Sequence, residues 1–224
     1  MKIIISCYIS QEVKNYFSKK GIEIILTMPF SCDNSVLMHP DIQGFYDNGI
    51  FFTSSDFYDY YKHEIKNICV SDEKIGTKYP YDVLFNCFKA ENYIFCNKKY
   101  IDKKLLEYLS NHYNVVNVKQ GYTNCSCLYL GKKCVATSDE GMTKALIKNN
   151  FKTIYIDNSH IKLKKYKNGF IGGSGINIGD EIVFFGNIDI PIYKELTNFL
   201  KSNKIKYKHF PFPLEDYGSG IVIK

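Results

Sequence analysis

Polar side chains of chemically versatile types recur in short segments along this chain, and several of them stand next to glycine or proline. They include carboxylates, amides and hydroxyls, together with a histidine and a cysteine, so as a set they can bind a polar or cationic ligand and transfer protons. The set is His39, Asp41, Asp82, Asn86, Asn124, Cys125, Ser126, Ser174, Asn177, Asp216 and Ser219. Because no single segment holds a complete catalytic group, the fold must assemble any site from several parts of the chain.

The familiar cofactor and metal motifs do not occur. Segment Gly172-Gly173-Ser174-Gly175 lacks the Gly-Lys-Ser/Thr ending of a phosphate loop and leads into a strand pattern rather than a helix, so it predicts a tight strand start. The other histidines have no partner at helical spacing. We therefore expect neither a cofactor nor a metal.

The cysteines indicate a reducing environment. Eight stand at positions 7, 32, 69, 87, 96, 125, 127 and 134, and none forms a C-x-x-C pair. Most lie in apolar runs, where a free cysteine packs as a small hydrophobic residue. Their spacing supports neither a disulfide framework nor a zinc site. We expect a cytoplasmic protein.

The charge and hydropathy of the chain argue against nucleic acid and membrane as partners. All 29 basic side chains are lysines, and the net charge is +6. The lysines are scattered and cannot form the bidentate fork of arginine, so a solvated face is favoured over a nucleic-acid surface. Residues 1–9 predict a buried strand rather than a signal peptide, and no stretch approaches the ~18 apolar residues of a membrane span.

A strand–strand–helix–strand module recurs along the chain. The clearest copy predicts strands at 128–130 and 134–137, a helix over 140–149 capped by Asp139, and a strand at 153–156. The next copy predicts strands at 176–178 and 181–185, a helix over 192–201 and a strand at 204–210. The two earlier copies predict strands at 36–45, 49–53 and 68–70 around a helix over 57–66, then strands at 81–88, 93–96 and 113–118 around a helix over 103–109.

The two ends of the chain complete one further module. A strand at 219–223 resembles a module start, and a strand at 1–5, a helix over 11–19 and a strand at 22–27 resemble a module without its first strand. We predict one α/β domain over residues 1–224, a five-fold pseudo-symmetric propeller closed by pairing of its N- and C-terminal segments. Closure would protect the strand edges. An ordinary α+β domain with fortuitous recurrences is the alternative.

This arrangement resembles the pentein fold, the five-bladed α/β propeller of the guanidine-modifying enzymes and of a ribosome anti-association factor. More narrowly, residues 121–186, with the segments GYTNCS, TSDEGMTKAL and GFIGG, are similar to a bacterial group assigned to that fold. The likeness in pattern covers most of the chain. Its motifs are more specific for the fold than for any activity.

The resemblance implies a cysteine nucleophile, a histidine for proton transfer and two acidic residues that hold a guanidinium group. The family's cysteine lies in the last module, but the corresponding run here, residues 216–221, contains none. Cys125 follows Gly121 in its own module much as the family's nucleophile follows its glycines. On that basis Cys125 would be the nucleophile and His39 the acid/base, with Asp41 and Asp216 holding the cation.

Three functional hypotheses remain open. The first is a non-catalytic protein that binds a small polar or cationic ligand in the central channel, with Asp41, Asn86, Asn124, Ser174, Asn177 and Asp216 as the binding residues. The second is a divergent hydrolase or amidinotransferase that acts on a guanidino or amidino compound through Cys125. The third is a ribosome- or RNA-associated factor. We favour the first, because the cysteine expected in the last module is missing.

Overall fold

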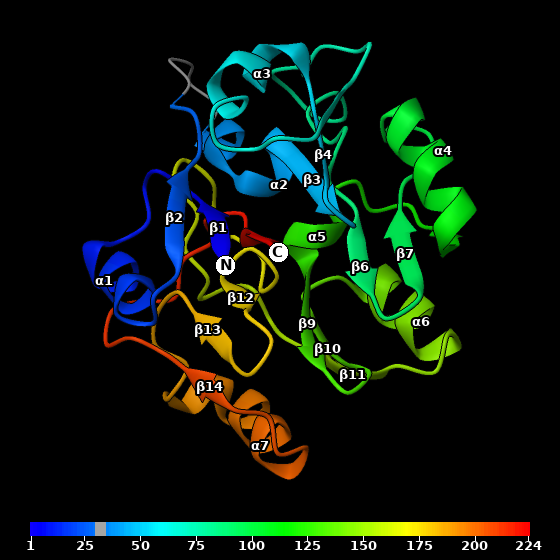
Figure 1. Cartoon of the computed structure of the whole chain (residues 1–224). Helices are drawn as coiled ribbons and strands as arrows, with labels where there is room; N and C mark the ends of the chain where they lie inside the picture. The colour runs from blue at the N-terminus through cyan, green and yellow to red at the C-terminus, as the bar shows by residue number, and fades with distance from the viewer. Residues whose placement is uncertain (30–34) are drawn as a thin grey trace.

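The computed structural model describes residues 1–29 and 35–224, which form five small three-stranded sheets arranged around a common centre (Figure 1). In every sheet the first strand is antiparallel to the second, and the third strand is parallel to the second. A helix connects the two parallel strands of each sheet. This is the predicted module, and the prediction of a five-fold α/β ring is confirmed.

Four modules are continuous in sequence. The first contains β3 (Gly44–Asp47), β4 (Ile50–Thr53), α3 (Ser55–Tyr61) and β5 (Ile68–Val70). The second contains β6 (Phe88–Ala90), β7 (Tyr93–Cys96), α4 (Lys103–His112) and β8 (Asn114–Asn117). The third contains β9 (Cys127–Gly131), β10 (Cys134–Thr137), α6 (Glu140–Lys148) and β11 (Lys152–Tyr155). The fourth contains β12 (Gly175–Asn177), β13 (Ile182–Phe184), the 3-10 turn η2 (Pro191–Tyr193), α7 (Lys194–Ser202) and β14 (Tyr207–Lys208).

The fifth module joins the two ends of the chain, as predicted. β15 (Gly220–Ile223) pairs antiparallel with β1 (Lys2–Ile5), which in turn pairs in parallel with β2 (Glu23–Leu26) after α1 (Gln11–Lys19). The register sets Ile4 opposite Ile221. In Figure 1 both termini lie near the middle of the ring. The closing pair therefore places the last residues of the chain beside the channel.

The helix that connects the two parallel strands of each module packs its apolar face on its own sheet and lies at the outside of the ring (Figure 1). In α6, Met142 and Leu146 are buried at helical spacing. The Asp139 carboxylate accepts a hydrogen bond from the Met142 backbone N–H at 2.7 Å, so the predicted cap is confirmed. The apolar contacts form several separate clusters between neighbouring modules. The polar residues lie instead at the inner end of the ring, where the segments that precede the first strand of each module meet.

Two predicted strands are wrong at that inner end. Residues 36–43 form the 3-10 turn η1 (Ser35–Met38) and the short helix α2 (Pro40–Gln43), and only 44–47 are strand. Pro40 is the first helical residue, where its fixed φ and missing N–H are tolerated. Residues 81–87 form turns, and the strand begins at Phe88. A third short helix, α5 (Thr123–Ser126), precedes β9. These turns, not strands, carry the polar side chains.

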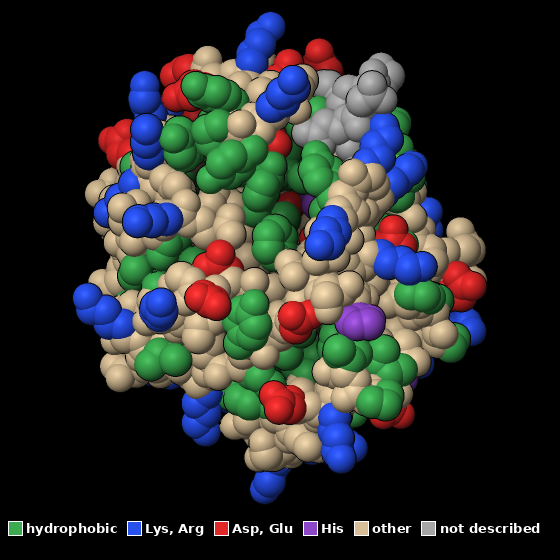
Figure 2. All heavy atoms as spheres, turned by 180° about the vertical axis from the view of Figure 1, so that it is seen from behind, with side chains coloured by type: hydrophobic (Ala, Val, Ile, Leu, Met, Phe, Trp, Pro, Cys, Tyr) green, Lys and Arg blue, Asp and Glu red, His purple; other side chains and the backbone are tan. Residues whose placement is uncertain are grey.

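Other predictions concern cysteine and membrane insertion. Seven cysteines lie in the part of the chain that the structure describes, and all are free thiols; Cys32 falls outside the described residues. No described helix has the length and apolar character needed to cross a membrane. On the face in Figure 2, lysine and acidic side chains are interspersed rather than gathered into a basic patch.

The glycines of segment 172–175 allow close packing at the ring's inner end. A Cβ on Gly172 would overlap the backbone of Asn124, and one on Gly173 would overlap the Asp216 carboxylate. We expect Gly173→Ala to destabilise the protein by about 1–3 kcal/mol through overpacking. Gly141→Ala is the control, because it lies in the first turn of α6 and meets only the end of the Asp139 side chain. Urea unfolding midpoints measure both, and equal stability of the two variants would contradict this packing.

Candidate functional site

Three segments from different modules meet at the inner end of the ring. His39 has an extended backbone and is the residue before α2, so Asp41 lies in the first turn of that short helix. Cys125 belongs to α5. Asp216 lies in the closing segment that leads into β15. All four side chains are buried, and together we call them the channel cluster.

The Cys125 thiol is held by hydrogen bonds. Its Sγ donates to Asp41 Oδ2 at 2.9 Å and accepts from the Asn86 side-chain amide at 3.4 Å. The Asn124 amide also donates to Asp41 Oδ2, at 3.1 Å. The side-chain oxygen of Asn86 accepts from the Asn124 backbone N–H at 2.8 Å. The side chains of Asn86 and Asn124 thus fix the positions of the thiol and of one carboxylate.

His39 and Asp216 form the other half of the cluster. The Asp216 carboxylate accepts backbone N–H groups of Phe170, at 2.8 Å, and Gly218, at 2.9 Å. Its Oδ1 lies 3.7 Å from His39 Nδ1, too far for a hydrogen bond. A Cβ on Gly218 would overlap the imidazole ring, so the glycine lets the closing segment approach His39 closely.

The ionisation of the cluster is governed by burial. Burial raises the pKa of Asp41 to about 6, against the hydrogen bonds from Cys125 and Asn124. Burial likewise raises the pKa of Asp216 to about 7 and lowers the pKa of His39 to about 3. Burial and the nearby carboxylates of Asp41 and Asp216 raise the pKa of the Cys125 thiol well above its ordinary value. At neutral pH the cluster therefore holds a neutral imidazole and a protonated thiol.

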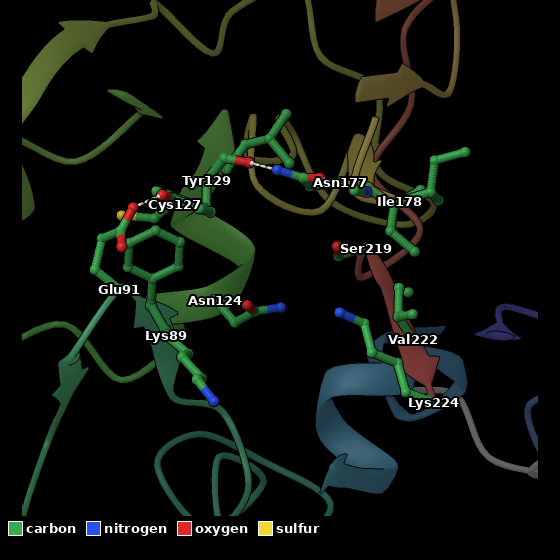
Figure 3. Close-up of a pocket in the computed structure, with 15 residues that line it drawn as sticks. Lys89, Glu91, Asn124, Cys127, Tyr129, Asn177, Ile178, Ser219, Val222 and Lys224 are labelled. Atoms are coloured by element: carbon green, nitrogen blue, oxygen red, sulfur yellow. Dashed lines mark hydrogen bonds between the residues drawn. The ribbon is translucent and has the colours of Figure 1, made fainter. Parts of the chain in front are cut away.

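A cavity of about 480 Å³ opens beside the cluster. Its polar lining includes Asn124, Asn177, Ser219 and Lys224, and its apolar walls come from β9, β12 and β15. Figure 3 shows the Lys224 amino group and the Asn124 amide pointing toward one another across this space. Since the Asn124 amide also donates to Asp41, it connects the open cavity with the buried cluster.

Some of the eight predicted site residues lie together in the structure, and others do not. It brings together six of them, namely His39, Asp41, Asn86, Asn124, Cys125 and Asp216. Asn177 lines the cavity, but its amide donates to the Tyr129 carbonyl and its side-chain oxygen accepts the Gly179 N–H. Ser174 is buried and donates to the Ile171 carbonyl at 2.9 Å, a contact within its own turn.

Several cavity residues were absent from the sequence prediction. Lys89 lies in β6 and Glu91 in the turn that follows this strand, and both line the cavity, but no sequence motif marks either residue. Lys89 forms a salt bridge with Asp47, and Glu91 accepts a hydrogen bond from Tyr129. Lys224 carried no signal, because it follows the last strand without a motif around it.

Comparisons with known proteins agree with this fold. The model of a family described as "Family of unknown function (DUF6873)" matches residues 4–221. A search of curated proteins finds no match. Many solved structures are similar to the chain, and those named below are pentein-fold enzymes, so the predicted pentein fold is confirmed.

Three of these structures illustrate the likeness. Dimethylarginine dimethylaminohydrolase from Pseudomonas aeruginosa, a cysteine-to-serine mutant complexed with citrulline, has 9% identity and a TM-score of 0.57, with 94% of this chain and 91% of that chain covered. The amidinotransferase SxtG of saxitoxin biosynthesis, from Microseira wollei, has 9% identity and a TM-score of 0.57, covering 94% and 88%. The N-terminal domain of ArgZ, a cyanobacterial arginine dihydrolase bound to its substrate, has 11% identity and a TM-score of 0.59, covering 94% and 91%.

The raised pKa of Asp216 predicts a pH-dependent stability. Its folded-state pKa of about 7 lies above the ordinary 3.8, so the native state retains a proton that the unfolded state releases between those values. The stability from this group is fully present below about pH 4 and is lost as pH rises through about 7. We therefore expect Asp216→Asn to gain stability relative to wild type between pH 5 and pH 8. Urea unfolding at both values measures this, and parallel pH curves for the two proteins would contradict it.

Proposed function

Because the chain belongs to the DUF6873 family and has the pentein fold, we propose that it binds a small molecule with a guanidinium, amidinium or ammonium group in its central channel. The cationic group lies against Asp41 and Asp216. The rest of the ligand occupies the cavity lined by Asn124, Asn177 and Ser219.

The observation that carries this proposal is a pair of buried carboxylates without a lysine partner among the described residues. Asp41 and Asp216 are 4% and 3% exposed, and within residues 1–29 and 35–224 the basic side chain in an ion-pair contact with either is His39. Its low pKa makes it neutral at pH 7. By contrast, the equally buried Asp47 has Lys89 beside it and accepts hydrogen bonds from two tyrosines. A buried carboxylate pair of this kind is stabilised by an incoming cation.

The cavity suits a ligand with a second polar end. Lys224 follows β15, and its side chain points into the space toward Asn124 (Figure 3), so its ammonium group can pair with a ligand carboxylate. The similar structures were determined with citrulline or with the substrate of an arginine dihydrolase, both of which are amino acids with a urea or guanidino end. A cationic group that replaces the Asn124 amide at Asp41 Oδ2 would keep that carboxylate hydrogen-bonded.

The binding test uses isothermal titration with L-arginine and agmatine, which share a guanidinium group and differ in the carboxylate. We expect wild type to bind at least one probe, and Asp41→Asn and Asp216→Asn each to weaken binding about tenfold or more, because a charge-assisted hydrogen bond is worth about 1.5–3 kcal/mol. Lys224→Ala should weaken L-arginine binding alone.

Asp102→Asn is the matched control for this test. Asp102 is also buried, but it caps α4 by accepting the Leu105 N–H and lies outside the channel. Asparagine is an equally good cap, so binding should not change. The proposal would be refuted if neither probe bound to wild type. It would also be refuted if the Asp41 and Asp216 variants bound the probes with the same affinity as wild type.

A second candidate is hydrolysis or group transfer through Cys125, and the thiol's hydrogen bond to Asp41 favours it. In that reaction the thiol proton passes to Asp41 or His39 while sulfur bonds to the guanidinium carbon. The carbon–nitrogen bond to the leaving amine then breaks, and the amine takes the proton. Water then adds to the carbon and gives a proton to Asp41 or His39, the carbon–sulfur bond breaks, and the departing sulfur takes that proton. The remaining proton of the cationic intermediate passes to solvent, so a neutral urea group and the free thiol result. An acceptor amine in place of water would give transfer.

Turnover separates this candidate from simple binding. We expect the ligand-free Cys125 thiol to resist alkylation at neutral pH, because it is 2% exposed and its pKa is raised, whereas the partly exposed Cys7 and Cys69 react. If the protein is an enzyme, a bound guanidinium probe should speed alkylation of Cys125. Cys125→Ser should then lower formation of the urea product at least about a thousandfold, while Cys134→Ser retains it, because this buried thiol lies in β10 and outside the cavity lining. If wild type binds a probe but forms no urea product, the binding function stands and the enzymatic function is rejected.

A further inference from the structure

The channel cluster also contains a set of potential metal ligands. One ring nitrogen of His39, one carboxylate oxygen of Asp41 and the sulfur of Cys125 all lie within 4.8 Å of one another. All three side chains are buried. Two of them come from α2 and the residue before it, and the third from α5, so short helices hold all three. Cysteine spacing alone predicts no such site, because these ligands come from separate modules.

Two atoms in this set have no hydrogen-bond partner. His39 Nδ1 and Asp41 Oδ1 are both buried and unpartnered among the described residues. Each belongs to a residue only 4% exposed. A buried polar atom without a partner costs about 1–3 kcal/mol, and here two such atoms belong to the same small cluster. A bound ion would satisfy both at once.

The donor types select the ion. Calcium and magnesium prefer oxygen ligands, so a site with a sulfur and an imidazole does not suit them. Zinc binds thiolate, imidazole and carboxylate at about 2.0–2.3 Å, which the mutual distances within this cluster permit. We propose that His39, Asp41 and Cys125 form a binding site for a zinc-type divalent transition-metal ion. The sulfur binds as thiolate, and its proton leaves to solvent as the metal enters.

The surroundings of the three ligands fit this assignment. Asp216 Oδ1 lies 3.7 Å from His39 Nδ1 and places a further carboxylate beside the three ligands, which favours a bound cation. Asn86 donates to the Cys125 sulfur and can stabilise a thiolate. Three protein ligands leave the fourth position of a tetrahedral ion open, which is the pattern of sites that bind an exchangeable ligand.

The metal site shares Asp41 with the proposed guanidinium site, but its evidence is independent of that proposal. A metal ion and a guanidinium group would compete for the same carboxylate. Binding of the cationic probes to chelator-treated protein and binding of the metal are therefore separate measurements. Loss of one does not imply loss of the other, so the two proposals fail in distinguishable ways.

The test is a titration of the chelator-treated intact protein with Co²⁺, followed by displacement with Zn²⁺. Cobalt bound to a thiolate gives a sulfur-to-metal charge-transfer absorption, which reports a sulfur ligand directly. We expect this absorption to saturate at one ion per chain and to disappear when Zn²⁺ is added. Absence of the absorption in wild type would overturn the proposal without recourse to any variant.

Single substitutions identify the side chains that bind the metal ion. Cys125→Ser should abolish the charge-transfer absorption, and His39→Ala and Asp41→Asn should each weaken metal affinity at least about tenfold, since even outer partners of metal ligands contribute that much. Cys127→Ser is the matched control, because this buried thiol hydrogen-bonds Thr137 rather than the cluster and should leave the absorption unchanged. Near-ultraviolet circular dichroism confirms that each variant is folded. An absorption retained by folded Cys125→Ser, or lost in Cys127→Ser, would overturn the assignment.

Discussion

The pairing of β15 with β1 is the interaction on which the rest of this structure depends. Without it, β1 would leave one edge of its sheet unpaired, and the ring of modules would have two free ends. With it, the closing segment is drawn to the centre, where the Gly218 backbone packs against His39 and Asp216 receives two backbone N–H groups. Closing the ring and assembling the channel cluster are thus one structural event.

Pseudo-symmetry sets what the centre can hold. Equivalent positions of the five modules point to one axis, so large side chains cannot occupy all of them. Two residues before their first strands, the second and third modules carry Asn86 and Cys125, which contact each other. The same position in the fourth and fifth modules is glycine, and these two glycines contact Asp216 and His39. Glycine in two modules therefore makes room for charged or ionisable groups contributed by others.

The repeat could be recognised from sequence because each module buries its own helix and strands with local patterns. Helix 11–19 and the strands at 93–96 and 134–137 were predicted at their observed bounds. The errors lie at 36–43 and 81–87, where apolar residues are buried without strand pairing. There Pro40 begins a helical turn, and Gln43 binds the backbone of Met28. Apolar content alone cannot distinguish such buried turns from strands.

The sequence indicated which residues lie at the candidate site better than it indicated how those residues ionise. Glycine or proline beside polar residues marked the inner ends of the modules, and six of the eight predicted residues do meet there. Their ionisation could not be read from the sequence, because it depends on burial among residues far apart, as in the Cys125–Asp41 contact across 84 positions. Burial keeps the Cys125 thiol protonated. The carboxylates of Asp41 and Asp216 lie in the same buried cluster, and neither has a lysine partner among the described residues. In the binding function that we propose, an incoming cation would compensate these carboxylates, and its positive charge would also lower the thiol pKa.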